Sequence, residues 1–374
     1  MGHRVQRMTA RHGKLEDMHK TLFLGGDVYS PADPFATAML IDGDSVAWVG
    51  SDEAARAVGD SAEVVELDGA LVTPAFVDAL ADGSAPDAAS AGAARGVAAV
   101  HITVGADDVE RFAPDEESDT AVYIAAQVST AAEADEWKDA APWLTGFAAE
   151  VGDDGDIAAQ IAAATSAGLQ ARFTAADDGQ LARVLAGYDA AAESAGRARL
   201  AAAGHRVDIA HAASDDMIAE MNSRRLSVGV RPGDGEARIG SMIKAGIPVA
   251  FGAAGTDGAP DPWGSVRAAV FADDPNERIS ARAAFTAHTR GGRRVAGGPG
   301  DGALVPGAQA TFTIWAPTDL LVQVADERIA AWSTDPRSGT PGLPDLADPE
   351  FRPTCLSTVR RGRRVHMSEQ GRSA

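Results

Sequence analysis

Short apolar runs alternate with Ala-rich amphipathic stretches through the middle of the chain. We predict strands at 71–79, 97–105, 120–128, 143–151, 169–176, 205–212, 226–232 and 247–255. Helical periodicity is clearest between these runs, at 156–168, 179–196 and 215–225. This alternation is typical of βα units around a parallel sheet, so we predict an α/β fold, a (β/α)8 TIM-like barrel. In such a barrel the chemistry lies at the carboxyl ends of the strands.

The two ends of the chain have a different pattern, with short Val-, Leu- and Trp-rich runs separated by glycine-containing turns. Neither end is long enough to bury a sheet alone, so we expect them to pair into one small β-sandwich. We predict a disordered leader over 1–20, a composite β-sandwich from 21–72 and 307–367, the barrel over 73–306 and a tail over 368–374. Within the leader, Met8 or Met18 could be the true start.

Charge and cysteine content narrow the range of partners. The 374 residues contain 33 Lys+Arg and 54 Asp+Glu, which gives a net charge of −21. Proteins bind nucleic acid or an anionic membrane through basic faces, so an acidic chain is a poor partner for either. The single cysteine, Cys355, excludes an internal disulfide and a cysteine-based zinc site. Without a long apolar segment or a secretory signal, we expect a soluble, cytoplasmic protein.

Five segments of the chain form a recognisable set: GDVYSPADP, DGDSVAWVG, DGALVTPAFVDA, IKAGIPVAFGAAG and GALVPGAQATFTIWAP. Together they resemble the amidohydrolase superfamily, especially its imidazolonepropionase-like or amidohydrolase 3 group of metal-dependent hydrolases. The resemblance extends over residues 21–366 and implies a barrel with a sandwich built from both termini. It also implies a family chemistry in which one or two divalent metals activate water to hydrolyse non-peptide C–N bonds.

The family's metal ligands do not carry over to this chain. The resemblance implies an H-x-H pair after the first strand, a Lys after the fourth, histidines after the fifth and sixth, and an Asp after the eighth. The corresponding residues here are Leu80 and Asp82, Glu150, Thr174, Ile209 and Ala254. Leu80 and Ile209 offer carbon where a metal needs nitrogen. We therefore predict a pseudoenzyme with no catalytic residues, no metal and no cofactor.

Other polar residues near the predicted barrel mouth keep alternatives open. We name Asp78, His101, Asp178, Asp208 and His211 as pocket candidates. A shift of two residues would make His211 a ligand of the sixth strand, and His101 is expected to be a buried barrel histidine. The carboxylates of Asp78, Asp82, Glu150 and Asp208 could instead form an oxygen-only site for Mg²⁺ or Ca²⁺.

Three functions follow from these observations. The first is a non-catalytic structural or regulatory subunit, in a homo-oligomer or in a hetero-oligomer with an active homologue. The second is an active C–N hydrolase with rearranged ligands, which alone would require zinc or another divalent metal. The third is a small-molecule binding protein that uses the emptied barrel pocket.

Overall fold

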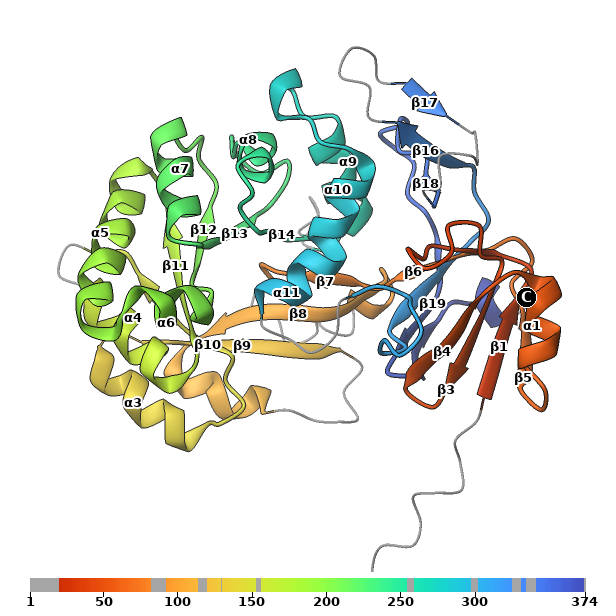
Figure 1. Cartoon of the computed structure of the whole chain (residues 1–374), viewed down its shortest axis with the longest axis horizontal. Helices are drawn as coiled ribbons and strands as arrows, with labels where there is room; N and C mark the ends of the chain where they lie inside the picture. Colours follow the sequence, from red (N-terminus) through yellow and green to blue (C-terminus); the bar gives the residue numbers. More distant parts are fainter. Residues whose placement is uncertain are drawn as a thin grey trace, which may run out of the picture.

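The computed structural model contains an eight-stranded barrel with its helices, packed beside smaller sheets that come from the two ends of the chain (Figure 1). The structure describes residues 20–81, 92–113, 120–128, 130–152, 156–253, 259–296, 302–324, 331–333 and 341–372. The predicted leader over 1–20 thus lies almost entirely outside the described residues.

The barrel confirms the predicted fold class. Its strands are β7 (Phe76–Asp78), β8 (Val97–Val104), β9 (Ala121–Gln127), β10 (Gly146–Glu150), β11 (Gln170–Ala175), β12 (Arg206–Ile209), β13 (Ser227–Val230) and β14 (Val249–Phe251). Neighbouring strands follow chain order, and every paired neighbour is parallel. The N–H of Ala79 donates to the carbonyl of Phe251 at 2.9 Å, which connects the first strand to the last. Each barrel strand falls inside one of the runs predicted from the sequence.

The predicted strand 71–79 is in fact two strands. Its first half, β6 (Leu71–Pro74), pairs antiparallel with β15 (Phe312–Trp315) in a sheet outside the barrel. Pro74 has no N–H, so it cannot donate a hydrogen bond that would continue the pairing of β6. The next two N–H groups, of Ala75 and Phe76, donate to Thr311 and Gly96, so the chain crosses from one sheet to the other there.

The barrel helices begin at side-chain caps. Asp156 caps α4 (Ile157–Ala167), Asp177 caps α5 (Asp178–Ala195) and Ser214 caps α7 (Asp215–Ser223), each accepting a hydrogen bond from a first-turn N–H. These helices confirm the three predicted ones. The others near the barrel are η1 (Ala106–Phe112), α3 (Ala131–Ala140), α6 (Arg197–Ala203), α8 (Ile239–Lys244), α9 (Pro262–Val270), η2 (Pro275–Glu277), α10 (Ala281–Thr286), the π-turn η3 (Ala287–Gly291) and α11 (Gly292–Val295). Among the described helices, none combines the length and apolarity needed to cross a membrane.

Both ends of the chain build the sheets beside the barrel, as predicted. One sheet contains β4 (Ser45–Gly50), β3 (Ala38–Asp42), β1 (Lys20–Leu24) and β5 (Glu63–Glu66), with α1 (Asp52–Val58) nearby. The other contains β2 (Asp27–Val28), β6, β15, β19 (Cys355–Arg360) and β20 (Arg363–Met367). Phe23 of the first sheet meets Phe312 of the second, with ring centroids 5.3 Å apart, in one apolar cluster. A third, small sheet is formed by β17 (Ala331–Ser333), β16 (Leu320–Val324) and β18 (Leu343–Pro344).

An aromatic cluster joins the barrel to these sheets. Phe76 on β7 contacts Trp263 of α9, Phe285 of α10 and Trp315 of β15, with ring centroids 5.0, 5.3 and 5.9 Å away. The indole of Trp315 donates to the hydroxyl of Thr73 at 2.9 Å, so its one polar atom is paired. The first barrel strand is therefore held against the outer sheet by ring contacts.

Truncating the centre of this cluster should be costly. We expect Phe76→Ala to lower the free energy of unfolding by about 3–5 kcal/mol, because the vacated volume is fully enclosed. Chemical denaturation followed by tryptophan fluorescence measures the change. The matched control is Phe35→Ala, since Phe35 is 54% exposed and its loss should cost about 0.5 kcal/mol or less. Equal effects of the two substitutions would contradict the importance of the cluster.

A buried histidine makes the fold sensitive to acid. The ring Nδ1 of His205 accepts from the N–H of Ala171 at 2.9 Å, and its Nε2 lies 3.0 Å from the hydroxyl of Thr165. Burial lowers the pKa of His205 to about 4. The unfolded chain therefore binds this proton more readily, so stability present above pH 6.5 is lost as the pH falls toward 4.

The size of this effect can be tested by substitution. His205 should contribute a loss of up to about 3 kcal/mol between pH 6.5 and 4, because its pKa is depressed by burial. We expect His205→Asn to be less stable than the parent at pH 7 and to lose less stability on acidification. Urea unfolding at several pH values gives both quantities. A parallel pH dependence in the two proteins would show that His205 does not titrate as described.

Candidate functional site

Three positions singled out from the sequence lie in one row across the barrel strands. Glu150 on β10 is in register with Thr174 on β11, and Thr174 is in register with Asp208 on β12. Residues paired in a parallel sheet face the same side, so the three positions share a face. Thr174 is exposed, whereas Asp208 is buried. Asp82 and Ala254 lie outside the described residues, as does the side chain of Glu150.

Asp78 joins the two edges of the barrel sheet. Its Oδ1 accepts from the N–H of Leu80 and from the N–H of Ala253, both at 3.0 Å. Burial raises the pKa of this carboxyl, while the two backbone donors and the nearby Arg231 and Arg206 act in the opposite direction. The carboxylate thus bridges the ends of β7 and β14, next to the half-buried Leu80.

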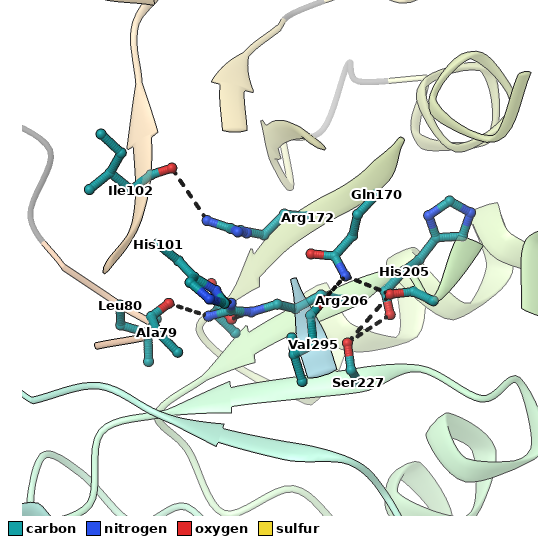
Figure 2. Close-up of polar contacts among 12 residues, drawn as sticks. Ala79, Leu80, His101, Ile102, Gln170, Arg172, His205, Arg206, Ser227 and Val295 are labelled. Atoms are coloured by element: carbon teal, nitrogen blue, oxygen red, sulfur yellow. Dashed lines mark hydrogen bonds and ion pairs between the residues drawn. The ribbon is translucent and has the colours of Figure 1, made fainter. Parts of the chain in front are cut away.

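A buried guanidinium occupies the interior of the barrel. Arg206 on β12 donates from Nε to Asp208 at 2.5 Å and from Nη2 to the carbonyl of Ala79 at 2.7 Å. Its Nη1 lies 3.0 Å from Nδ1 of His101 on β8. Figure 2 shows Arg206 between His101 and Ala79, so that one side chain contacts three separate parts of the barrel.

The imidazole of His101 is held in its neutral form. Burial lowers its pKa well below the ordinary value, and the positive charges of Arg206, Arg172 and Arg293 lower it further. Because a guanidinium can only donate, Nδ1 of His101 is the acceptor from Arg206 and its proton is on Nε2. His101 therefore acts as an acceptor for a buried cation.

A second guanidinium lies beside the first. Arg172 on β11 is buried, and its Nη1 is 3.5 Å from the carbonyl of Ile102, also drawn in Figure 2. Burial and the neighbouring Arg206 lower the pKa of Arg172 to about 9, so it remains protonated at neutral pH. Arg231, after β13, donates to the carbonyl of Leu80. The barrel interior consequently carries a concentration of positive charge.

Two glycines leave the space that these side chains fill. A Cβ at Gly229 would lie 2.1 Å from Oδ1 of Asp208 and 2.3 Å from Nη2 of Arg206. A Cβ at Gly252 would lie 2.8 Å from Cγ of Arg231 and 2.8 Å from Cβ of Leu80. Any side chain at either position would collide with the arginines, so the network depends on both glycines.

Ile209 does not share the face of Asp208. Arg206 and Asp208 are two residues apart and bonded to each other, so the alternating residues Val207 and Ile209 point to the opposite side of β12. Ile209 is buried in the large apolar cluster that includes the helices around the barrel. Its side chain is therefore part of the core and does not line the row formed by Thr174 and Asp208.

The structure does bring two of the pocket candidates together. His211 follows β12 and Asp178 begins α5, and Nε2 of His211 is 3.1 Å from Oδ1 of Asp178. The two side chains are 18% and 42% exposed, so the edge of the pair reaches solvent. Nε2 of the neutral ring donates to the carboxylate, which leaves Nδ1 as the nitrogen that can accept a proton, and Nδ1 is buried without a hydrogen-bond partner among the described residues.

The described residues do not fit a divalent metal centre. Within the described parts of the chain, no three His, Cys, Asp or Glu side chains converge as a metal-binding group. Asp208 is paired with Arg206, and Asp78 uses one oxygen on two backbone N–H groups. Buried guanidiniums beside these carboxylates would also repel a second cation.

The arginines were missed as functional residues in the sequence, although a signal was present. Arg172 and Arg206 each interrupt an otherwise apolar predicted strand, and a charged residue inside a parallel barrel strand requires a buried partner. Arg206 also stands two residues before Asp208, which puts both on one face. Arginine is not a metal ligand, so neither residue belongs to the histidines and carboxylates that the family resemblance singles out.

Removing the central cation should destabilise the barrel. We expect Arg206→Met to cost about 3–5 kcal/mol of unfolding free energy, because Asp208 would remain as a buried, unpaired carboxylate. The matched control is Arg197→Met, which removes an ion pair with Asp189 whose arginine is 72% exposed, and should cost about 1 kcal/mol or less. Urea denaturation compares the two. A loss no larger than the control's would mean that the internal network is not stabilising the fold.

Solved structures of metal-dependent hydrolases share this architecture. An adenosine deaminase from Xanthomonas campestris with bound zinc superposes with a TM-score of 0.65 at 15% identity, covering 94% of each chain. Atrazine chlorohydrolase TrzN from Arthrobacter aurescens TC1 complexed with zinc gives 0.63 at 16% identity, covering 94% of this chain and 98% of its own. An uncharacterized metal-dependent hydrolase from Pyrococcus furiosus gives 0.64 at 15% identity, with 80% and 99% covered. At such identities these similarities establish the fold alone.

The sequence itself identifies the family. No curated protein sequence matches the chain. The profile of the amidohydrolase family, Amidohydro_3, matches residues 88–366, which is well over half of the 374 residues. This match confirms the resemblance seen in the sequence segments, and the chain belongs to the amidohydrolase family.

Proposed function

We propose that this chain is a non-catalytic member of the amidohydrolase family. It acts as a structural or regulatory subunit in the cytoplasm, in a homo-oligomer or in a hetero-oligomer with an active homologue. The observation that carries the proposal is the contact of Arg206 with Asp208, His101 and the carbonyl of Ala79 inside the barrel.

This contact supports the proposal on electrostatic grounds. A carboxylate that neutralises a buried guanidinium cannot also offer its charge to a divalent ion without leaving the guanidinium uncompensated. His101 is likewise committed, because Nδ1 accepts from Arg206. The substitutions at Leu80 and Thr174 remove nitrogen ligands from the neighbouring strand ends. The family's hydrolysis requires a metal-activated water, for which these residues provide no described ligand set.

The His211–Asp178 pair favours a second candidate function. Asp178 orients the imidazole of His211 at 3.1 Å, as a carboxylate does for a general base, so the chain could be a C–N hydrolase with rearranged residues. This candidate requires either a divalent metal or access of water to Nδ1 of His211, which is buried. It differs from the first candidate in turnover, and its metal-dependent form differs in metal content as well.

Metal content and turnover together distinguish the two candidates. The chain is expressed with added zinc and manganese, purified without chelator, and its bound metals are quantified by mass spectrometry against protein concentration. We expect near-zero occupancy, because the internal arginines already supply the positive charge that Asp208 neutralises. Zinc-complexed atrazine chlorohydrolase TrzN, handled in parallel, establishes that the procedure retains a bound metal.

One or two metals per chain would overturn the proposal. Loss of the ion in His211→Ala or in Asp208→Asn would then place it at the carboxyl end of β12, since Asp208 lies in that strand and His211 follows it. Turnover without metal that is lost in His211→Ala would instead support the rearranged hydrolase.

A further inference from the structure

A row of exposed arginines lines a groove on the outer surface of the barrel. Arg282 in α10, Arg290 in η3 and Arg294 in α11 belong to three consecutive helical segments, and all three line one hollow of about 500 Å³. Another part of the lining, the apolar wall, is formed by Ile243 at the end of α8 and by Pro248 and Val249 at the start of β14. The groove thus combines cationic and apolar lining residues.

These arginines have no carboxylate partner in the described part of the chain. No ion pair among described residues includes any of the three. This is notable in a chain with 54 acidic and 33 basic residues, where carboxylates are abundant. Three guanidiniums left unpaired side by side repel one another, which an anionic ligand would relieve.

We propose that this groove binds a small molecule that carries two or more phosphate groups. Guanidinium groups match phosphate oxygens in bidentate geometry, and they are the preferred side chains for phosphate recognition. Arg282 and Arg294 are twelve residues apart, which is roughly 18 Å or less along helical segments that rise about 1.5 Å per residue where they are α-helical. A ligand with two or more phosphates therefore spans the row better than a single phosphate does. The apolar wall would contact the organic part of the ligand.

The size and position of the groove are consistent with such a ligand. Small-molecule sites commonly enclose about 300–1,000 Å³, a range that includes this hollow. Arg282 and Arg290 also line a smaller hollow of about 80 Å³ beside Tyr29 of the outer sheets. The groove borders the first residue of β14, whereas Ala253 and Asp78 meet beyond the opposite end of that strand. The inference therefore does not depend on whether the barrel interior is catalytic.

Tripolyphosphate is the probe for this site. Isothermal titration calorimetry of the full chain, with chloride balancing the ionic strength, should show saturable binding at one site per chain. Replacing the three groove arginines by glutamine should weaken this binding roughly tenfold or more, because charge-assisted hydrogen bonds are lost. The groove variant is Arg282→Gln/Arg290→Gln/Arg294→Gln. The control variant, Arg56→Gln/Arg199→Gln/Arg364→Gln, removes three exposed arginines elsewhere and changes the net charge by the same amount, so its affinity for tripolyphosphate should stay within about twofold of the parent's.

Three outcomes would overturn the proposal. They are the absence of saturable tripolyphosphate binding to the parent chain, an equal loss of affinity in the control variant, and tighter binding of hexaglutamate than of tripolyphosphate. The last outcome would assign the groove to an acidic peptide. Since all six arginines are exposed, both variants should fold, and thermal unfolding followed by circular dichroism verifies this.

Discussion

Burying a guanidinium inside a parallel barrel sets strict conditions on everything around it. Arg206 needs acceptors in several directions, and it finds them in Asp208, the carbonyl of Ala79 and Nδ1 of His101. The same residue Ala79 donates its N–H to Phe251 and so connects the first strand to the last. Gly229 must lack a side chain for the pair to fit. Barrel closure and the internal charge are therefore supported by overlapping contacts.

Positive charges gather at particular places in this protein although its net charge is negative. A net charge of −21 describes the whole chain, yet Arg172 and Arg206 lie inside the barrel and Arg282, Arg290 and Arg294 gather in one groove. Net charge governs long-range attraction and repulsion, whereas ligand binding depends on groups within a few ångströms. An acidic protein can thus offer a cationic site to a small anion. The guanidiniums inside the barrel meet acceptors of the protein itself, whereas those in the groove are exposed.

Most of the fold could be predicted because barrel strands are buried on both faces and read as apolar runs. The run 205–212 contains β12, and the pattern at the chain ends anticipated the composite sheets. The division of 71–79 at Pro74 was not predicted, because its two halves are equally apolar and only their different partners separate them. The positions of Leu80 and Thr174 could be read from family motifs. The contacts of the internal arginines could not, because the sequence shows that Arg172 and Arg206 interrupt apolar strands but does not show which acceptors they meet across the barrel.

The barrel, the pairing of the two chain ends and the family all follow from the amino-acid sequence, because periodicity and segment similarity are local properties of a linear chain. The contact of Arg206 with His101, 105 residues away, and the contact of His211 with Asp178 come from the folded arrangement. The same arrangement points the side chain of Ile209 toward the core and places three arginines beside the start of β14. The physical reason is that hydrogen bonds and ion pairs act over a few ångströms, and those distances are set by strand register and helix packing rather than by sequence spacing.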